Sequence, residues 1–443
     1  MPDKGAFGQF VTGVFTWAGG CGMMTAEVTV TGRAASRSGG MSAARPPLIR
    51  ALNEQLLLGH IRRLGQCSRA DLARLSGLSK PTVSLALAAV EQAGLIRAAG
   101  QQTGRPGRTA QLYEVRPDAG YLLGLDLGAQ YLRGAVADLA GVVRARGAVR
   151  LHASSVRGRI GELVRLADGL CADAGVDRAA ITQTVLGSPG VWNPRRDVMA
   201  LTGRPTGWER PEVMVRLREE LGANLVMEND INAAALAEQA EGHGRESGSF
   251  AFVSVGTGIG MGLVVGGQLV RGAHGAAGEI AYVPMTGGHG AEPGTEPGDG
   301  TPAAGWRGAF EEASSAAAVV RSARRAGLRG PVSARSVFQA AARGDDRAAE
   351  VVADEAQLVA RMLCAVISVI DPELIVLGGG IGQAPGFADA VIAELGPMAP
   401  VLPDVRVSAL GTEAVVDGCL AAAAELAWGR LTVDLPAAAP AAG

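Results

Sequence analysis

The pattern of apolar and polar residues changes near residue 120 and divides the chain into two parts. Before that point, over residues 67–98, apolar residues recur at helical spacing in two short runs separated by a turn. After it, apolar runs of strand length alternate with helical patterns, and several of them end in glycine-rich turns. The pattern therefore predicts a small helical domain followed by a larger α/β body.

Two helices joined by a tight turn are predicted in the first part. Ser68 and Asp71 have the spacing of a capping box, so we expect a first helix over 69–76 that ends at Gly77. Ser79 is then placed to cap a second helix, since its hydroxyl can accept a hydrogen bond from the first helical turn.

The second helix has the features of a DNA-recognition helix. Pro81 falls in its first turn, where a missing N–H costs no hydrogen bond. Its apolar residues at helical spacing are expected to face the core: Val83, Leu87 and Val90. The residues at its N-terminal end, which meets base edges in a helix-turn-helix, are left outward: Ser79, Lys80, Pro81, Thr82, Ser84 and Leu85. An ordinary helical hairpin remains the alternative.

A short hairpin is predicted directly after these helices. Residues 94–97 end the helix and begin an apolar strand, and residues 111–115 supply a partner strand. The loop between them carries Arg105 and Arg108, which could contact phosphates or enter a narrow minor groove. This is the wing of a winged helix-turn-helix, unless the hairpin is merely a solvated basic loop.

The distribution of charge favours DNA binding. Residues 48–112 contain nine Lys and Arg residues against three Asp and Glu residues, a net charge of +6. The whole chain has a net charge of −2, so the remainder carries −8. A basic module on an acidic body directs one face of the protein toward DNA.

The larger body contains three glycine-rich turns that follow predicted strands, at 126–130, 256–260 and 378–380. Backbone N–H groups in such turns can hold phosphate oxygens. Acidic residues, Asp126 and Asp230, also fall at strand ends. The turns therefore predict a nucleotide-binding arrangement formed by Asp126, Gly128, Gly256, Thr257, Gly258, Gly378 and Gly379.

Length and composition limit the classes of protein to consider. A chain of 443 residues is too long for one compact core, so we expect domains at 46–116 and 117–434, with 1–45 and 435–443 disordered. The five cysteines show no paired spacing, which argues against a disulfide framework or a zinc finger and fits a reducing cytoplasm. No stretch is long and apolar enough for a membrane span, and the N-terminal residues make a poor signal peptide.

The order of several motifs resembles the ROK family of repressors, open reading frames and sugar kinases. The motifs are LGLDLGAQ ending at Gln130, GSPG at 187–190, ENDINAAALAE at 228–238, GTGIGMGLVVGGQLVRGAHGAAGE at 256–279 and DPELIVLGGG at 371–380. The resemblance covers about 48–430 and has the arrangement of the repressor branch. It implies an N-terminal winged helix-turn-helix followed by a two-lobed, actin-like ATPase (ribonuclease H-like) fold, with sugar and nucleotide bound between the lobes.

The sequence departs from the kinases of that family in the first phosphate loop. Where family kinases have D-x-G-G-T, this chain has Ala129 and Gln130 in place of the second glycine and the hydroxyl. Phosphoryl transfer depends on positioning around the γ-phosphate, so a bulkier loop is expected to impair it. Asp230 matches the family's catalytic base and is retained, but a carboxylate there could equally accept a hydrogen bond from a bound sugar.

The family's zinc site is also absent from the sequence. Tyr282 stands where the family has a zinc-ligating histidine, and the following loop contains no cysteine. His274 and His289 alone cannot supply about four ligands, so no metal is expected. The resemblance leaves a polar set able to bind sugar hydroxyls: Asn229, Asp230, Glu279 and Glu311. Alternatively, these side chains only cap helices or pair with arginines.

Together these features predict a transcriptional regulator, most simply a repressor, that responds to a sugar or sugar phosphate without phosphorylating it. Its expected partners are a double-stranded DNA operator with an inverted repeat and further copies of itself, as a homodimer or homotetramer. We expect no cofactor, no membrane association and no enzymatic activity. The alternatives are an ATP-dependent sugar kinase that carries a helix-turn-helix, with Asp230 catalytic, and a DNA-binding protein that responds to no effector.

Overall fold

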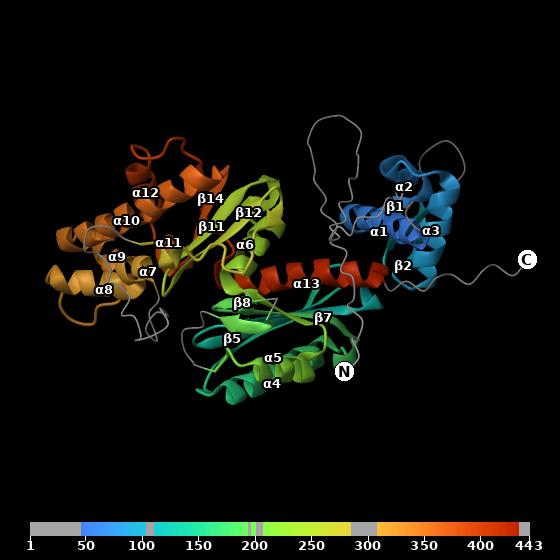
Figure 1. The fold of residues 1–443 in the computed structure, drawn as a ribbon, viewed down its shortest axis with the longest axis horizontal. Coiled ribbons are helices and arrows are strands. Elements are labelled where there is room, and N and C mark those ends of the chain that lie inside the picture. Colours follow the sequence, from blue (N-terminus) through green and yellow to red (C-terminus); the bar gives the residue numbers. More distant parts are fainter. Residues whose placement is uncertain (1–45, 103–109, 194–195, 201–206, 285–307, 434–443) are drawn as a thin grey trace, which may run out of the picture.

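The computed structural model describes residues 46–102, 110–193, 196–200, 207–284 and 308–433. The N-terminal unit begins with α1 (Pro46–Leu64), followed by β1 (Gln66–Ser68), α2 (Arg69–Ser76) and α3 (Lys80–Gln92). An antiparallel pair, β2 (Ile96–Gln102) and β3 (Ala110–Val115), completes it, and β1 pairs with β3 in a three-stranded sheet. The unit stands at one end of the molecule (Figure 1).

The predicted helix ends are confirmed in this unit. Ser68 and Asp71 form a capping box at the start of α2, which ends at Gly77 with a φ of 69°. Ser79 caps α3 by accepting a hydrogen bond from the Thr82 N–H at 3.3 Å. The predicted core positions of α3 are fully buried: Val83, Leu87 and Val90.

The first lobe is built on a five-stranded sheet in the order β10-β7-β4-β5-β6. The strands β4 (Tyr121–Leu127), β5 (Tyr131–Asp138) and β6 (Val143–Arg150) form an antiparallel meander, and β7 (Ile181–Ser188) and β10 (Leu225–Asn229) add in parallel. The helices α4 (Val156–Ala174) and α5 (Pro211–Leu221) cover one face (Figure 1). A small ribbon of β8 (Val191–Asn193) and β9 (Val198–Ala200) lies beside β10.

The second lobe has a five-stranded sheet in the order β13-β12-β11-β14-β15. Its strands are β11 (Phe250–Val255), β12 (Ile259–Val265), β13 (Gln268–Leu269), β14 (Leu374–Gly378) and β15 (Asp404–Val407). On one face lies α6 (Asp230–Ala240), and on the other is a helical layer: α7 (Ala309–Ser314), α8 (Ala316–Arg325), α9 (Ala334–Ala342), α10 (Asp346–Ile370), α11 (Gly379–Gly382) and α12 (Phe387–Leu395). Short 3-10 turns occur at Pro117–Ala119, Arg178–Ala180, His243–Glu246, Ile280–Tyr282 and Gly411–Glu413.

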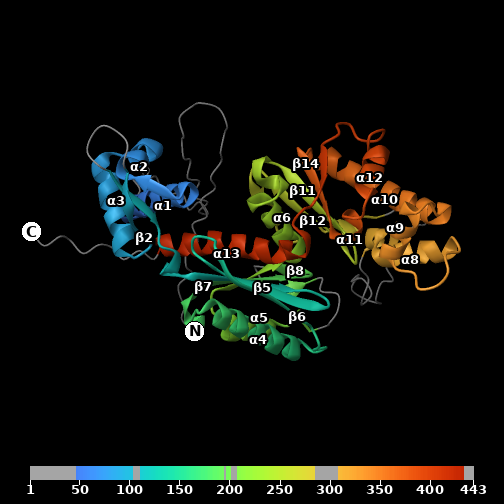
Figure 2. The same ribbon diagram turned by 180° about the vertical axis from the view of Figure 1, so that it is seen from behind.

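The last helix, α13 (Ala414–Val433), joins the three parts of the molecule. It packs on β4 and β7 of the first lobe, against α6 of the second, and touches α1 of the N-terminal unit. Both views place α1 beside the far end of this helix (Figures 1 and 2). Within the described residues, no helix is long and apolar enough to cross a lipid bilayer.

Candidate functional site

Four predicted carboxylates, Asp126, Asp230, Glu279 and Glu311, form what we call the carboxylate cluster. They come from the end of β4, the start of α6, the turn before Ile280–Tyr282 and α7, respectively. Burial, followed by the charge of Asp230, raises the pKa of Asp126 to about 7. Burial, followed by the charges of Asp230 and Glu311, raises the pKa of Glu279 to about 7. These electrostatic effects link residues that are up to 104 positions apart in the chain, namely Asp126 and Asp230.

Asn229 and Asp230 lie at the junction of β10 and α6. The Asn229 Oδ1 caps α6 by accepting from the N–H groups of Ile231 and Asn232 at 2.9 and 3.1 Å, and its Nδ2 donates to the Gly190 carbonyl at 3.0 Å. Asp230 Oδ1 also accepts from the Ile231 N–H at 2.9 Å. Burial raises the pKa of Asp230 to about 6, so this carboxyl group can change protonation near neutral pH. Asn229 thus has a structural role whether or not it also touches a ligand.

Glu311 is positioned against the second glycine-rich turn. Its Oε2 accepts a hydrogen bond from the Ile259 N–H at 3.0 Å, and a Cβ on Gly258 would lie 3.0 Å from the same oxygen. The side chain is only 9% exposed. Glu311 therefore fixes the turn, in line with the structural alternative considered from the sequence, while the charge of Asp230 helps to raise the pKa of Glu279.

Two of the three predicted glycine-rich turns meet in the second lobe. They follow β11 and β14, which are parallel neighbours, so their carboxyl ends lie at one edge of the sheet. A Cβ on Gly256 would lie 3.2 Å from the Gly380 nitrogen, and one on Gly379 would lie 2.4 Å from the Val255 carbonyl oxygen. Gly379 also has a φ of +78°, which glycine adopts without strain. Thr257 is exposed at the tip of its turn, while Gly378 packs on Phe252.

The third turn belongs to the first lobe and lies beside a charged side chain, Arg133, that the sequence pattern did not assign to the site. It follows Asp126 at the end of β4, where Gly128 lies against the Tyr131 carbonyl. The Arg133 Nη1 lies 3.3 Å from Asp126 Oδ2, so the buried carboxyl group has a cationic neighbour. Arg133 occupies an alternating strand position, and only the tertiary structure turns it toward Asp126.

An ion pair links the lobes beside Asn229. Glu228 is 6% exposed, and its Oε2 accepts hydrogen bonds from the Arg271 guanidinium at 2.6 and 2.9 Å. Its Oε1 accepts from Asn232 Nδ2 at 3.2 Å. The sequence does hold a signal for this pair, since Glu228 directly follows the apolar run 225–227 and a buried charge requires a partner.

The residues considered for zinc are separated or fall outside the described part of the chain. Tyr282 is partly buried at the end of the Ile280–Tyr282 turn, and His274 is exposed in the preceding loop. His289 lies outside the described residues. Among the residues that are described, no group of three or more His, Cys, Asp or Glu side chains is arranged to hold a metal ion.

The N-terminal unit presents one end of α3 to solvent. Five of the six predicted recognition residues are exposed and Thr82 is partly buried. Leu85 is apolar and yet 63% exposed, so packing within the protein does not account for an apolar residue at this position. The exposed five are Ser79, Lys80, Pro81, Ser84 and Leu85. Arg105 and Arg108, the predicted wing residues, lie outside the described residues.

A two-lobed α/β body with glycine-rich turns and a carboxylate cluster defines the actin-like sugar kinase fold. The chain belongs to the ROK family, whose profile matches residues 122–420. It is 34% identical over 243 residues to the bifunctional enzyme NanE/NanK of Brucella suis, covering 51% of this chain and 43% of that protein. It is 23% identical over 243 residues to the xylose repressor of Bacillus subtilis, covering 55% and 63%. The chain thus matches about half the length of these curated relatives.

Solved structures show the same fold. The ROK hexokinase from Thermus thermophilus is 30% identical with a TM-score of 0.56, and the match covers 68% of this chain and 97% of the hexokinase. A ROK family transcriptional regulator, a homologue of the E. coli MLC protein, is 22% identical with a TM-score of 0.70. That match covers 87% of this chain and 99% of the regulator. Similarity therefore extends to both kinases and regulators.

Proposed function

We propose that the protein is a transcriptional regulator, acting as a repressor, that binds operator DNA through α1–β3 and a sugar or sugar phosphate at the carboxylate cluster. The observation that carries the proposal is the N-terminal unit itself: two capped helices in tandem and a hairpin, added to a complete ROK body. The fold likeness to a ROK regulator spans 87% of this chain, against 68% for the hexokinase. A sugar kinase requires no such unit.

The proposed DNA contact is the N-terminal end of α3. Lys80 and the hydroxyls of Thr82 and Ser84 supply donors and acceptors of the kinds that read phosphates and base edges, and Leu85 offers an apolar contact for a thymine methyl group. The charge of +6 over residues 48–112, against −8 for the rest of the chain, supports this orientation. In the same proposal, Arg105 and Arg108 contact the backbone or the minor groove, and a symmetric dimer or tetramer binds an inverted repeat.

The DNA contact is tested on operator fragments recovered by genome-wide mapping of the bound protein. Lys80→Ala should weaken binding to all sequences and lower the slope of log affinity against log salt by about 1, because one phosphate contact is lost. Thr82→Ala or Ser84→Ala should weaken binding to the operator alone, by about 1–3 kcal/mol. Arg329→Ala, which removes an exposed charge from the second lobe, is the control. Unchanged binding in all three variants would exclude α3 as the recognition helix.

The proposed effector site is the carboxylate cluster. Asp230 and Glu279 can accept hydrogen bonds from sugar hydroxyls, and a ligand that supplies these donors offsets the cost of burying the carboxylates. Turnover is not expected, because Ala129 and Gln130 replace the glycine and hydroxyl of the kinase phosphate loop. Gly256, Thr257, Gly258, Gly378, Gly379, Asp126 and Gly128 then remain as a vestigial nucleotide site.

Asp230→Asn tests the effector site. It should abolish sugar-dependent release of operator DNA and leave affinity without sugar nearly unchanged, because α6 lies away from α3 (Figure 1). Calorimetry against a panel of mono- and disaccharides and their phosphates, with and without ATP, identifies the ligand. Glu219→Gln, on the exposed face of α5, is the matched control for loss of a carboxylate. Binding of every sugar with parental affinity by Asp230→Asn would refute the assignment.

An ATP-dependent sugar kinase is the second candidate. It is favoured by the retained Asp230, whose pKa of about 6 suits a general base, and by similarity to NanE/NanK and the hexokinase. Sugar-dependent ATP hydrolysis that disappears in Asp230→Asn would establish this function instead. If the protein binds an operator but no sugar alters that binding, the protein is a DNA-binding protein that responds to no effector.

A further inference from the structure

The helix α13 touches the N-terminal unit and both lobes. Its 20 residues span about 30 Å. It approaches α6 so closely that a Cβ on Gly418 would lie 1.6 Å from the Ala233 carbonyl oxygen. Since close-packed interfaces of this kind do not deform gradually, α13 and α6 move together or separate. Asp230 is the first residue of α6, so α13 is fastened to an element of the carboxylate cluster.

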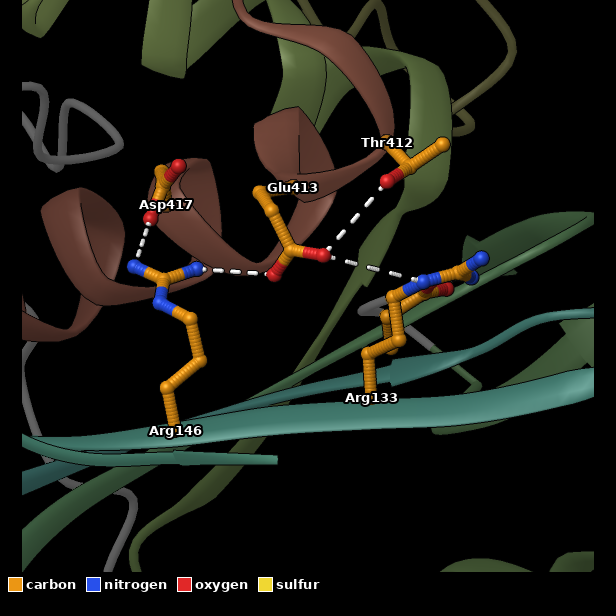
Figure 3. Close-up of polar contacts among 6 residues, drawn as sticks. Arg133, Arg146, Thr412, Glu413 and Asp417 are labelled. Atoms are coloured by element: carbon orange, nitrogen blue, oxygen red, sulfur yellow. Dashed lines mark hydrogen bonds and ion pairs between the residues drawn. The ribbon is translucent and has the colours of Figure 1, made fainter. Parts of the chain in front are cut away.

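The beginning of α13 is held to the first lobe by ion pairs. Two guanidinium groups rise from neighbouring strands toward it, Arg133 from β5 and Arg146 from β6 (Figure 3). Arg146 Nη1 donates to Glu413 Oε2 at 2.9 Å and its Nη2 donates to Asp417. Arg133 Nε lies 3.9 Å from Glu413 Oε1, to which the Thr412 hydroxyl donates at 3.5 Å. Glu413 therefore stands between the two arginines.

Arg133 contacts both Glu413, beside the start of α13, and Asp126 of the carboxylate cluster. Its Nη1 lies 3.3 Å from Asp126 and its Nε 3.9 Å from Glu413, both longer than the 2.7–2.9 Å of well-formed charged hydrogen bonds. A guanidinium group remains protonated in proteins, so Arg133 can respond to a ligand only by changing partners. We therefore expect a ligand that engages Asp126 or Arg133 to alter the contact between Arg133 and Glu413.

The other end of α13 is part of the core of the N-terminal unit. Glu425 forms an ion pair with Arg62 of α1. Ala427 and Trp428 are buried in the same hydrophobic cluster as residues of α1, namely Leu57, Leu58 and Ile61. A shift of α13 along its axis consequently moves α1 or exposes the apolar side chains of this shared core to water, which is unfavourable.

We propose that α13 couples the two sites: the contacts of Arg133 and Arg146 with Glu413 hold it in the DNA-binding position, and a ligand at the carboxylate cluster releases it by drawing Arg133 away. The proposal rests on the proposed function, because it assumes that the N-terminal unit binds DNA. Whether a change at Glu413 reaches α1 through α13 can be measured without DNA. The position of α1, and with it α2 and α3, then follows the occupancy of the cluster. Linkage requires that operator DNA weaken the ligand to the same degree.

Hydrogen exchange on the full-length chain tests the link without DNA or ligand. Glu413→Gln removes the charge that both arginines share, and Glu219→Gln on α5 is the matched control. We expect amides of α1 and of the last turns of α13 to exchange at least threefold faster in Glu413→Gln, with α4 and α5 unchanged. Faster exchange confined to the first turns of α13 would overturn the proposal, because the disturbance would not have reached α1.

A double-mutant cycle on an operator fragment tests the function of the link. Glu413→Gln and Glu425→Gln should each weaken DNA binding at least fivefold. The affinity of the double variant should be no lower than that of the single variant with the lower affinity, because both substitutions disrupt the same link through α13. Independent effects that multiply would overturn the proposal. If the parent protein itself binds no DNA, the proposed function fails, whereas the exchange experiment still decides whether α13 transmits the disturbance.

Discussion

One buried carboxyl group outside the carboxylate cluster, Glu355, should contribute to the pH dependence of this protein's stability. Glu355 projects from α10 and is 3% exposed, and its Oε1 accepts a hydrogen bond from the Ser314 hydroxyl at 2.7 Å. Burial raises the pKa of Glu355 from 4.5 to about 7, partly opposed by the Ser314 hydrogen bond. Ser314 ends α7, directly before the segment whose Ala316 N–H donates to the Gly256 carbonyl at 2.8 Å. Glu355 thus lies beneath the Gly256 turn.

The sign of the effect follows from the raised pKa. Below pH 4.5 the carboxyl group is protonated in both the folded and unfolded chain, and its contribution to stability is fully present. Between pH 4.5 and 7 the unfolded chain loses this proton while the folded protein keeps it, so the free energy of unfolding falls as pH rises. A shift of that size corresponds to about 3 kcal/mol, lost once the pH exceeds 7.

Glu355→Gln isolates this contribution, because the amide keeps an acceptor for Ser314 and cannot ionise. Urea titrations at pH 5 and pH 8 give the unfolding free energies of Glu355→Gln and of the parent. The value for the variant minus the value for the parent should be higher at pH 8 than at pH 5 by about 2–3 kcal/mol. Glu350→Gln, at an exposed position of the same helix, should show no such movement. A difference for Glu355→Gln that is the same at both pH values would refute the argument, whatever its size.

Two further predictions concern packing and capping, and urea unfolding measures both. Gly418→Ala should destabilise the protein by about 3 kcal/mol or more, because the added Cβ would lie 1.6 Å from the Ala233 carbonyl oxygen. The control is Gly429→Ala on the same helix, where a Cβ would meet nothing within 4 Å, and it should be neutral or slightly stabilising. Equal effects of the two substitutions would contradict the close approach at Gly418. Ser68→Ala should cost about 1 kcal/mol by removing the cap of α2, and no loss would show that the capping box does not stabilise that helix.

Local signals in the sequence were sufficient for the two helices α2 and α3, for the hairpin that follows them and for most strands of the two lobes. The ends of α2 and α3 were predicted because a cap, a proline or a glycine acts on its own neighbours along the chain. The longer strands of both lobes, β4 to β7, β10 to β12 and β14, were predicted from apolar runs that end in polar or glycine-rich turns, whereas the short strands β8, β9, β13 and β15 were not. These features require no knowledge of distant residues.

The roles of the polar side chains were less accessible from the sequence. Asn229 and Glu311 were expected to bind a ligand, and the structure also gives them hydrogen bonds that cap α6 and fix the Ile259 turn. Local support is therefore shown for both residues, and ligand binding by them stays a prediction. A motif identifies the residue type at a position, but the partner of that residue depends on which backbone groups the fold brings to it.

What the sequence alone determined is the succession of elements, the outward end of α3 and the separation of a basic module from an acidic body, all of which follow from spacing and composition. Only the tertiary structure placed Arg133 between Asp126 and Glu413, joined Glu228 to Arg271 and laid α13 across both lobes to reach α1. The reason is physical: Arg133 and Glu413 are 280 residues apart, and the energy of an ion pair depends on distance in space and on burial, neither of which a local pattern contains.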